Sequence, residues 1–88
     1  MAVVYSVSAE VRDIDGSRIR PINLRESDKA RFIQGCRLDF RREIYRLSNR
    51  LRDEMSTRFP SANGVIWIWV NGICQSKTPL LRLINVKR

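Results

Sequence analysis

The stretch NLRESDKARFIQGCRLDFRREIYRLSNRLRDEMSTRF, residues 23–59, carries the strongest structural signal in this chain. Its apolar side chains recur every three or four residues, which is the spacing of one face of an α-helix. Asn23 followed by Glu26 fits a capping box at the start, with Ser27 as the alternative cap. Phe59-Pro60 should end the helix, because a residue before proline disfavours helical geometry. We therefore expect one long amphipathic helix, whose apolar face carries Ile33, Cys36, Phe40, Ile44, Leu47, Leu51 and Met55.

Two strands are expected before this helix. Residues 3–12 alternate between apolar and mostly polar side chains, which is the pattern of a half-buried strand. Residues 13–16 follow as a turn, and residues 17–22 form a short second strand. Pro21 either limits that second strand to a sheet edge or ends it, because proline has no amide proton for a strand ladder.

Further strands are expected after the helix. Val65–Val70 is apolar on both faces, so both of its faces should be covered. Asn71-Gly72 is a strong signal for a two-residue hairpin turn, which makes Ile73–Lys77 the returning strand. Leu80–Val86 is either a last strand or a segment that drapes over the core. The chain therefore reads as a single α+β domain over residues 1–88, with a small antiparallel sheet, one long helix and the order ββαβββ or ββαββ.

The expected helix is too long for a domain of this size. It would extend for about 50 Å at 1.5 Å per residue, beyond the width of a small sheet. One helix also covers only one sheet face, whereas the strand at residues 65–70 calls for cover on two. We therefore expect a homo-oligomer, a dimer or a tetramer. The side chains expected at the oligomer or partner interface are Ile44, Leu47, Leu51, Trp67 and Trp69.

Composition narrows the classes of function. The chain has 88 residues, no histidine and two separated cysteines, which argues against a disulfide framework, a metal site or a cofactor site. Its serines have no histidine to activate them, and its acidic residues on the helix resemble ion-pair partners, so we expect no catalytic residues and no enzyme activity. No signal peptide is recognised, and the longest apolar run is too short to span a bilayer. These features predict a cytoplasmic protein without a membrane partner.

The charge of the chain favours an anionic partner. The formal net charge is +8, and fourteen of the seventeen basic residues are arginine, the residue suited to bidentate contacts with phosphate and carboxylate. Two interpretations of the helix arginines stay open. They either bind an anionic partner or are neutralised in a salt-bridged face by Asp39, Glu43, Asp53 and Glu54. The candidate binding residues are Arg37, Arg41, Arg42, Arg46 and Arg50.

Two tryptophans lie two residues apart on the most apolar strand. Trp67 and Trp69 therefore share one strand face. Three roles are open for them: a place in the core or in an oligomer interface, a hot spot for another protein, or a stacking platform for single-stranded nucleic acid.

The overall layout resembles the small antirepressors of temperate phages. The resemblance lies in a β start, an Arg-rich helix that ends at Arg58-Phe59-Pro60, and the strand and turn VIWIWVNG at residues 65–72. It implies a regulatory protein that binds a transcriptional repressor and releases it from its operator, in the host cell cytoplasm if a phage encodes it. The alternative hypothesis is a protein that binds DNA or RNA directly through the Arg-rich helix.

Overall fold

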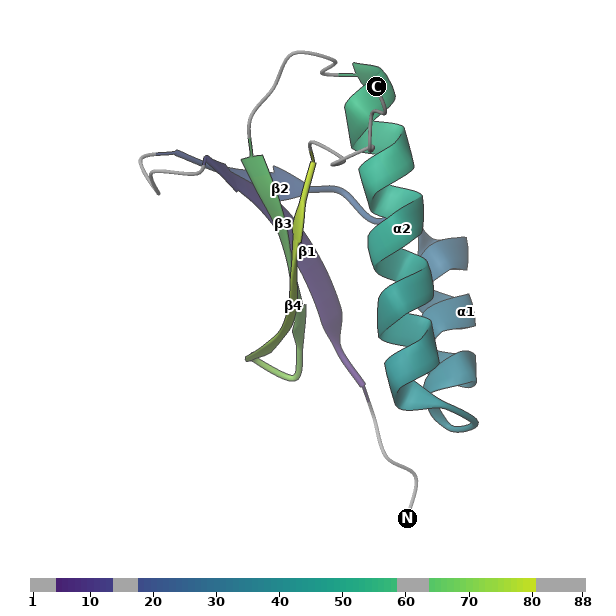
Figure 1. Cartoon of the computed structure of the whole chain (residues 1–88). Coiled ribbons are helices and arrows are strands. Elements are labelled where there is room, and N and C mark those ends of the chain that lie inside the picture. Colours follow the sequence, from purple (N-terminus) through teal and green to yellow (C-terminus); the bar gives the residue numbers. More distant parts are fainter. Residues whose placement is uncertain (1–4, 14–17, 59–63, 81–88) are drawn as a thin grey trace, which may run out of the picture.

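A computed structural model describes residues 5–13, 18–58 and 64–80 of the chain. In this part of the chain, two helices lie on one side of a four-stranded antiparallel sheet with the strand order β2-β1-β3-β4 (Figure 1). The expected α+β class with a small antiparallel sheet is confirmed. The elements are β1 (Val7–Asp13), β2 (Ile19–Ile22), α1 (Glu26–Cys36), α2 (Phe40–Arg58), β3 (Gly64–Val70) and β4 (Ile73–Pro79).

The hairpin between β3 and β4 forms as the sequence predicts. Asn71 and Gly72 both have positive φ angles, 52° and 79°, as a type I′ turn requires. Asn71 also continues the sheet beyond its own hairpin. Its backbone amide donates to the Ser6 carbonyl, and its side-chain Oδ1 accepts from the Ser6 amide, each at 2.8 Å. This turn therefore fixes both the hairpin and the start of the β1–β3 pairing.

The prediction of one continuous helix is wrong. The helical segment breaks after Cys36, where the backbone amides of Leu38 and Asp39 both donate to the Gly35 carbonyl at 2.9 Å. α2 then begins as a new helix, with the Asp39 carboxylate accepting the backbone amide of Arg42 at 3.2 Å. Asp39 is thus an N-cap inside the stretch that the sequence marks as uninterrupted.

The break lets α1 pack alongside α2 instead of continuing its axis. A Cβ atom on Gly35 would lie 2.2 Å from Cδ of Glu43, so glycine provides the space in which α2 approaches α1. α2 has 19 residues, or about 28 Å at 1.5 Å per residue, well short of the about 50 Å expected for one continuous helix. The argument for an oligomer from helix length therefore fails. The N-terminal cap also differs, because α1 begins after Arg25 without any side-chain cap and Ser27 lies inside the helix.

The core lies between the helices and the sheet. Ile44, Leu47 and Leu51, which the sequence places at an interface, are 9%, 1% and 2% exposed and belong to this core. They therefore do not lie on the surface of the described fold. On α1 the fully buried residue is Phe32, whereas Ile33 is only partly buried. The buried apolar residues are Ala9, Leu24, Phe32, Cys36, Ile44, Leu47, Leu51, Met55, Ile66, Ile68, Val70 and Leu80.

Both outer strands of the sheet carry features that discourage further strand pairing. β2 has only four residues, and Pro21 is one of them. β4 has an irregular register opposite Ile68 and Trp69, and it carries Lys77 and Pro79. Short strands, bulges, lysine and proline are the usual protection of sheet edges. The possible last strand at residues 80–86 lies outside the described residues, except for Leu80.

Candidate functional site

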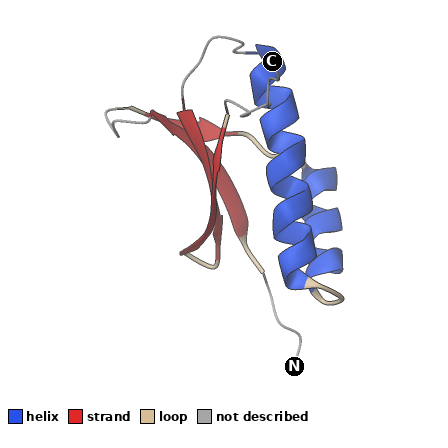
Figure 2. Cartoon of the chain, in the orientation of Figure 1, coloured by secondary structure: helices blue, strands red, loops and turns tan. Residues whose placement is uncertain are grey.

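The side of the sheet turned away from the helices is the first candidate site (Figure 2). Along β3 the alternate residues from Gly64 to Val70 are buried toward the helices. The residues between them are Val65, Trp67 and Trp69, and all three are only partly buried. No helix among the described residues covers this second face, so the cover that the sequence predicts for it does not come from the described part of the chain.

Cations from both neighbouring strands pack against the tryptophans. The Trp67 and Trp69 rings stack with centroids 5.8 Å apart and an interplanar angle of 25°. Arg12 of β1 places its guanidinium carbon 4.0 Å from the Trp67 centroid and 5.7 Å from the Trp69 centroid. Lys77 of β4 lies opposite Trp67 and places Nζ 4.2 Å from the same Trp67 centroid. Glu10 forms an ion pair with Arg12 and so anchors that guanidinium on the sheet.

We call this surface the aromatic face. It consists of Glu10, Arg12, Val65, Trp67, Trp69 and Lys77, and the β1–β2 register extends it to Pro21 and to Ile19, which is 51% exposed. The indole Nε1 of Trp69 is buried and has no hydrogen-bond partner in the described part of the chain. The ring is therefore held by packing alone. Tryptophan and arginine together in a half-buried surface are typical of protein–protein hot spots.

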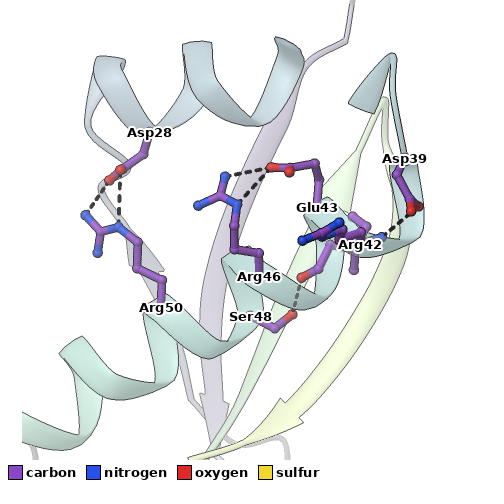
Figure 3. A network of polar contacts seen from close by, with 8 residues as sticks. Asp28, Asp39, Arg42, Glu43, Arg46, Ser48 and Arg50 are labelled. Carbon is purple, nitrogen blue, oxygen red and sulfur yellow. Dashed lines mark hydrogen bonds and ion pairs between the residues drawn. The ribbon is translucent and has the colours of Figure 1, made fainter. Parts of the chain in front are cut away.

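Two of the five candidate arginines are taken up by ion pairs within the chain. Arg46 donates to Oε1 of Glu43 through Nε at 3.0 Å and Nη2 at 2.6 Å (Figure 3). Arg50 reaches across to Asp28 in α1, with Nη2 2.7 Å from Oδ2 (Figure 3). It also donates to Glu54, a hydrogen bond that raises the pKa of Arg50 above its ordinary value. Arg46 and Arg50 therefore fit the interpretation in which acidic residues of the helices neutralise the arginines.

The other three arginines remain exposed. Arg37, Arg41 and Arg42 have no side-chain ion pair within the described residues, and they surround the turn between α1 and α2. Two large apolar side chains are exposed in the same segment. Leu38 is 90% exposed and Tyr45 is 71% exposed. The structure therefore divides the predicted arginine surface into a paired part beside α1 and an unpaired part at the helix turn.

The described residues include one buried thiol, that of Cys36. Burial raises the pKa of the Cys36 thiol, and the nearby Glu43 carboxylate raises it further, so the reactive thiolate is disfavoured. Across residues 5–13, 18–58 and 64–80, no group of three or more Cys, Asp or Glu side chains is arranged to hold a metal ion. Neither described helix has the length and apolar character needed to cross a membrane.

Sequence reasoning did not identify Lys77 as part of the site. A regular two-residue hairpin that pairs Val70 with Ile73 would place Lys77 opposite Ile66, toward the helices. The register shift between Ile68 and Trp69 moves Lys77 opposite Trp67 instead. A bulge of this kind has no reliable signature in the sequence.

Comparison with known proteins identifies no relative of this chain. No protein-family model, no curated protein and no solved structure matches this chain.

Proposed function

We propose that this chain is a non-enzymatic regulatory protein that binds another protein through the aromatic face. One observation carries the proposal. Trp67 and Trp69 stack on the sheet face that the described helices leave open, and Arg12 and Lys77 pack against Trp67. The rings expose apolar surface that is already held in one conformation, so little side-chain entropy is lost on binding. Such rigid aromatic anchors with arginine beside them supply much of the energy of protein interfaces.

The packing of the cations favours a protein over single-stranded nucleic acid at this face. A base stacks on an aromatic ring whose face is free. The Trp67 ring instead has a guanidinium group and an ammonium group within about 4 Å of its centroid, supplied by Arg12 and Lys77. A base would have to displace them. Acidic side chains of a protein can pair with these cations while apolar side chains cover the rings.

The partner that we propose is a transcriptional repressor. The layout of the chain resembles the small antirepressors, and their activity consists of binding a repressor and freeing its operator. The site of this activity would be the cytoplasm, the host cytoplasm for a phage protein. The net charge of +8 suits a partner with an acidic surface. Neither a cofactor nor a metal is needed for an activity of this kind.

A second copy of the chain is the alternative occupant of the aromatic face. The oligomer prediction rested on the length of the helix and on the open sheet face. Only the open sheet face still supports it. Two copies in contact through this face would bring Arg12 and Lys77 toward each other in a complex with twice the net charge of +8. Such repulsion favours an acidic partner over self-association. Light scattering on the chain alone separates the two, because a dimer through this face should dissociate in Trp67→Ala.

Titration with a repressor tests the proposal directly. A candidate repressor, chosen from the genes that neighbour this one, is purified and titrated with the chain by calorimetry, and its release from operator DNA is followed in a mobility-shift assay. We expect binding and release, with the affinity reduced at least tenfold in Trp67→Ala and unchanged in Gln34→Ala, an exposed position on α1. Equal binding by both variants would refute the use of the aromatic face.

A further inference from the structure

We infer that the turn between α1 and α2 is a second binding surface, which contacts the phosphate backbone of duplex DNA. It uses Arg37, Arg41 and Arg42. This goes beyond the proposed protein-binding function and does not depend on it. The aromatic face lies on the side of the sheet away from the helices, whereas this turn lies at one end of the helix pair (Figure 1). The two surfaces therefore leave room for two different partners at once.

The first argument is the way in which the helices use their acidic residues. Glu26 pairs with Lys29, Asp28 and Glu54 pair with Arg50, and Glu43 pairs with Arg46. Asp39 turns its carboxylate to the backbone amide of Arg42, as a helix cap. The three guanidinium groups at the turn receive no such partner among the described residues. Their charge is concentrated within six residues of sequence, which is an electrostatic attraction for a polyanion.

The second argument is the type and placement of the side chains. Arg41, Arg42 and Tyr45 lie at helix spacings of three and four residues, so Tyr45 has an arginine on either side. Arginine makes planar, bidentate contacts with phosphate, and Tyr45 adds a hydroxyl that suits the same oxygens. Leu38, almost fully exposed at the turn, supplies an apolar contact for the sugars between the phosphates. These groups together fit a nucleic-acid backbone and read no base.

Duplex DNA fits this surface better than a single strand or a membrane. Single strands are held by several aromatic rings on which successive bases stack, whereas Tyr45 is the one exposed ring among the described residues of this turn. A membrane surface would be held by buried apolar area, of which this turn offers only Leu38 and Tyr45. The duplex presents its phosphates on the outside, where three arginines on a rigid helix pair can reach them.

Binding to a random-sequence duplex of 30 base pairs, followed by fluorescence anisotropy, tests the inference. Each arginine that contacts a phosphate adds about 0.9 to the slope of log affinity against log salt concentration, so three should give a slope of about −2.7. We expect Arg41→Gln/Arg42→Gln to lower the slope to about −0.9 and the affinity in 50 mM salt by at least tenfold. Among the described residues these side chains make no ion pair or hydrogen bond that holds the fold, so the circular dichroism of the variant should match that of the unchanged chain.

The matched control is Arg18→Gln/Arg25→Gln. It removes the same charge from two exposed positions outside the turn and should lower the affinity by less than threefold. Equal losses in the two variants would show that net charge alone drives binding, and would overturn the inference. Three other results would also overturn the inference. They are no binding in 50 mM salt, equal affinity for the single strand of the same sequence, and tighter binding to vesicles of one-third phosphatidylserine. Trp67→Ala alters the aromatic face and leaves the turn unchanged, so it should bind DNA with the affinity of the unchanged chain. The DNA-binding inference and the proposed protein-binding function can therefore fail separately.

Discussion

The guanidinium carbon of Arg12 lies 4.0 Å from the centroid of the Trp67 ring, across two neighbouring strands of the sheet. Arg12 also pairs with Glu10, so one side chain links a carboxylate to an aromatic ring. Arg12→Ala removes both interactions. We expect the free energy of unfolding to fall by about 1 kcal/mol. Urea denaturation followed by tryptophan fluorescence measures the change. Arg12→Lys keeps a cation near the ring and should lose less, whereas full stability of Arg12→Ala would show that the contact contributes nothing.

Gly35 and Glu43 compete for the same space between the helices. Alanine at position 35 places its Cβ 2.2 Å from Cδ of Glu43, so Glu43 must move and lose its contact with Arg46. We expect Gly35→Ala to lower the free energy of unfolding by about 1–3 kcal/mol, even though alanine favours a helix by about 1 kcal/mol over glycine.

A double-mutant cycle isolates this contact. In a Glu43→Ala background the space is free, and Gly35→Ala should then leave stability unchanged or raise it by up to about 1 kcal/mol through helix propensity. Thermal unfolding of the four proteins completes the cycle. The same destabilisation in both backgrounds would mean that Glu43 is not the obstacle.

The ion pair between Arg50 and Asp28 connects α2 to α1. Arg50 is also bonded to Glu54, and its side chain is 30% exposed. Arg50→Gln removes the cation from the ion pairs with Asp28 and Glu54, and we expect a loss of about 1–2 kcal/mol with faster amide hydrogen exchange in α1. Arg42→Gln changes the same charge on the same helix without an ion pair and should stay within about 0.5 kcal/mol. Equal effects of the two substitutions would count against the ion pair as a link between the helices.

The substitution Leu47→Ala tests whether this residue belongs to the core of one chain or to an interface between two chains. Its side chain is 1% exposed in a single chain, so Leu47→Ala should lower the free energy of unfolding by about 2–5 kcal/mol at any protein concentration. Denaturation at several concentrations together with light scattering measures both properties. A substitution that shifted the chain from oligomer to stable monomer, without loss of monomer stability, would restore the interface interpretation.

The sheet was largely predictable because its signals are local. The Asn71-Gly72 turn needs two positive φ angles, which these residues adopt at low cost, and the apolar run before it leaves few alternatives to a strand. The face on which Trp67 would lie was not predictable. A strand that is apolar on both sides does not reveal which side the helices cover.

The helix break was hidden by an apolar spacing that continues through it. Cys36 and Phe40 both lie at or beside the core, so the interval of four residues between them looks like one more helical step. Gly35 and Asp39 were the available signals, one a poor helix former and the other a preferred N-cap.

The ion pair between Arg50 and Asp28 depends on how the two helices pack, whereas the pairs of Arg46 with Glu43 and of Arg50 with Glu54 form within α2. Asp28 and Arg50 are 22 residues apart and meet only because the chain turns back between them. Of these pairs, only the one between the two helices therefore required the tertiary structure.

Site-specific photo-crosslinking tests most directly whether the aromatic face binds a protein. A photoreactive amino acid at Ser8, which is exposed and lies opposite Trp69, samples this face in the cells that naturally express the chain. The same group at Gln34 on α1 is the control. We expect a discrete protein adduct at position 8 that is missing at position 34 and disappears in Trp67→Ala. A protein adduct that persists in Trp67→Ala, or the lack of any protein adduct at position 8, would contradict the proposed function.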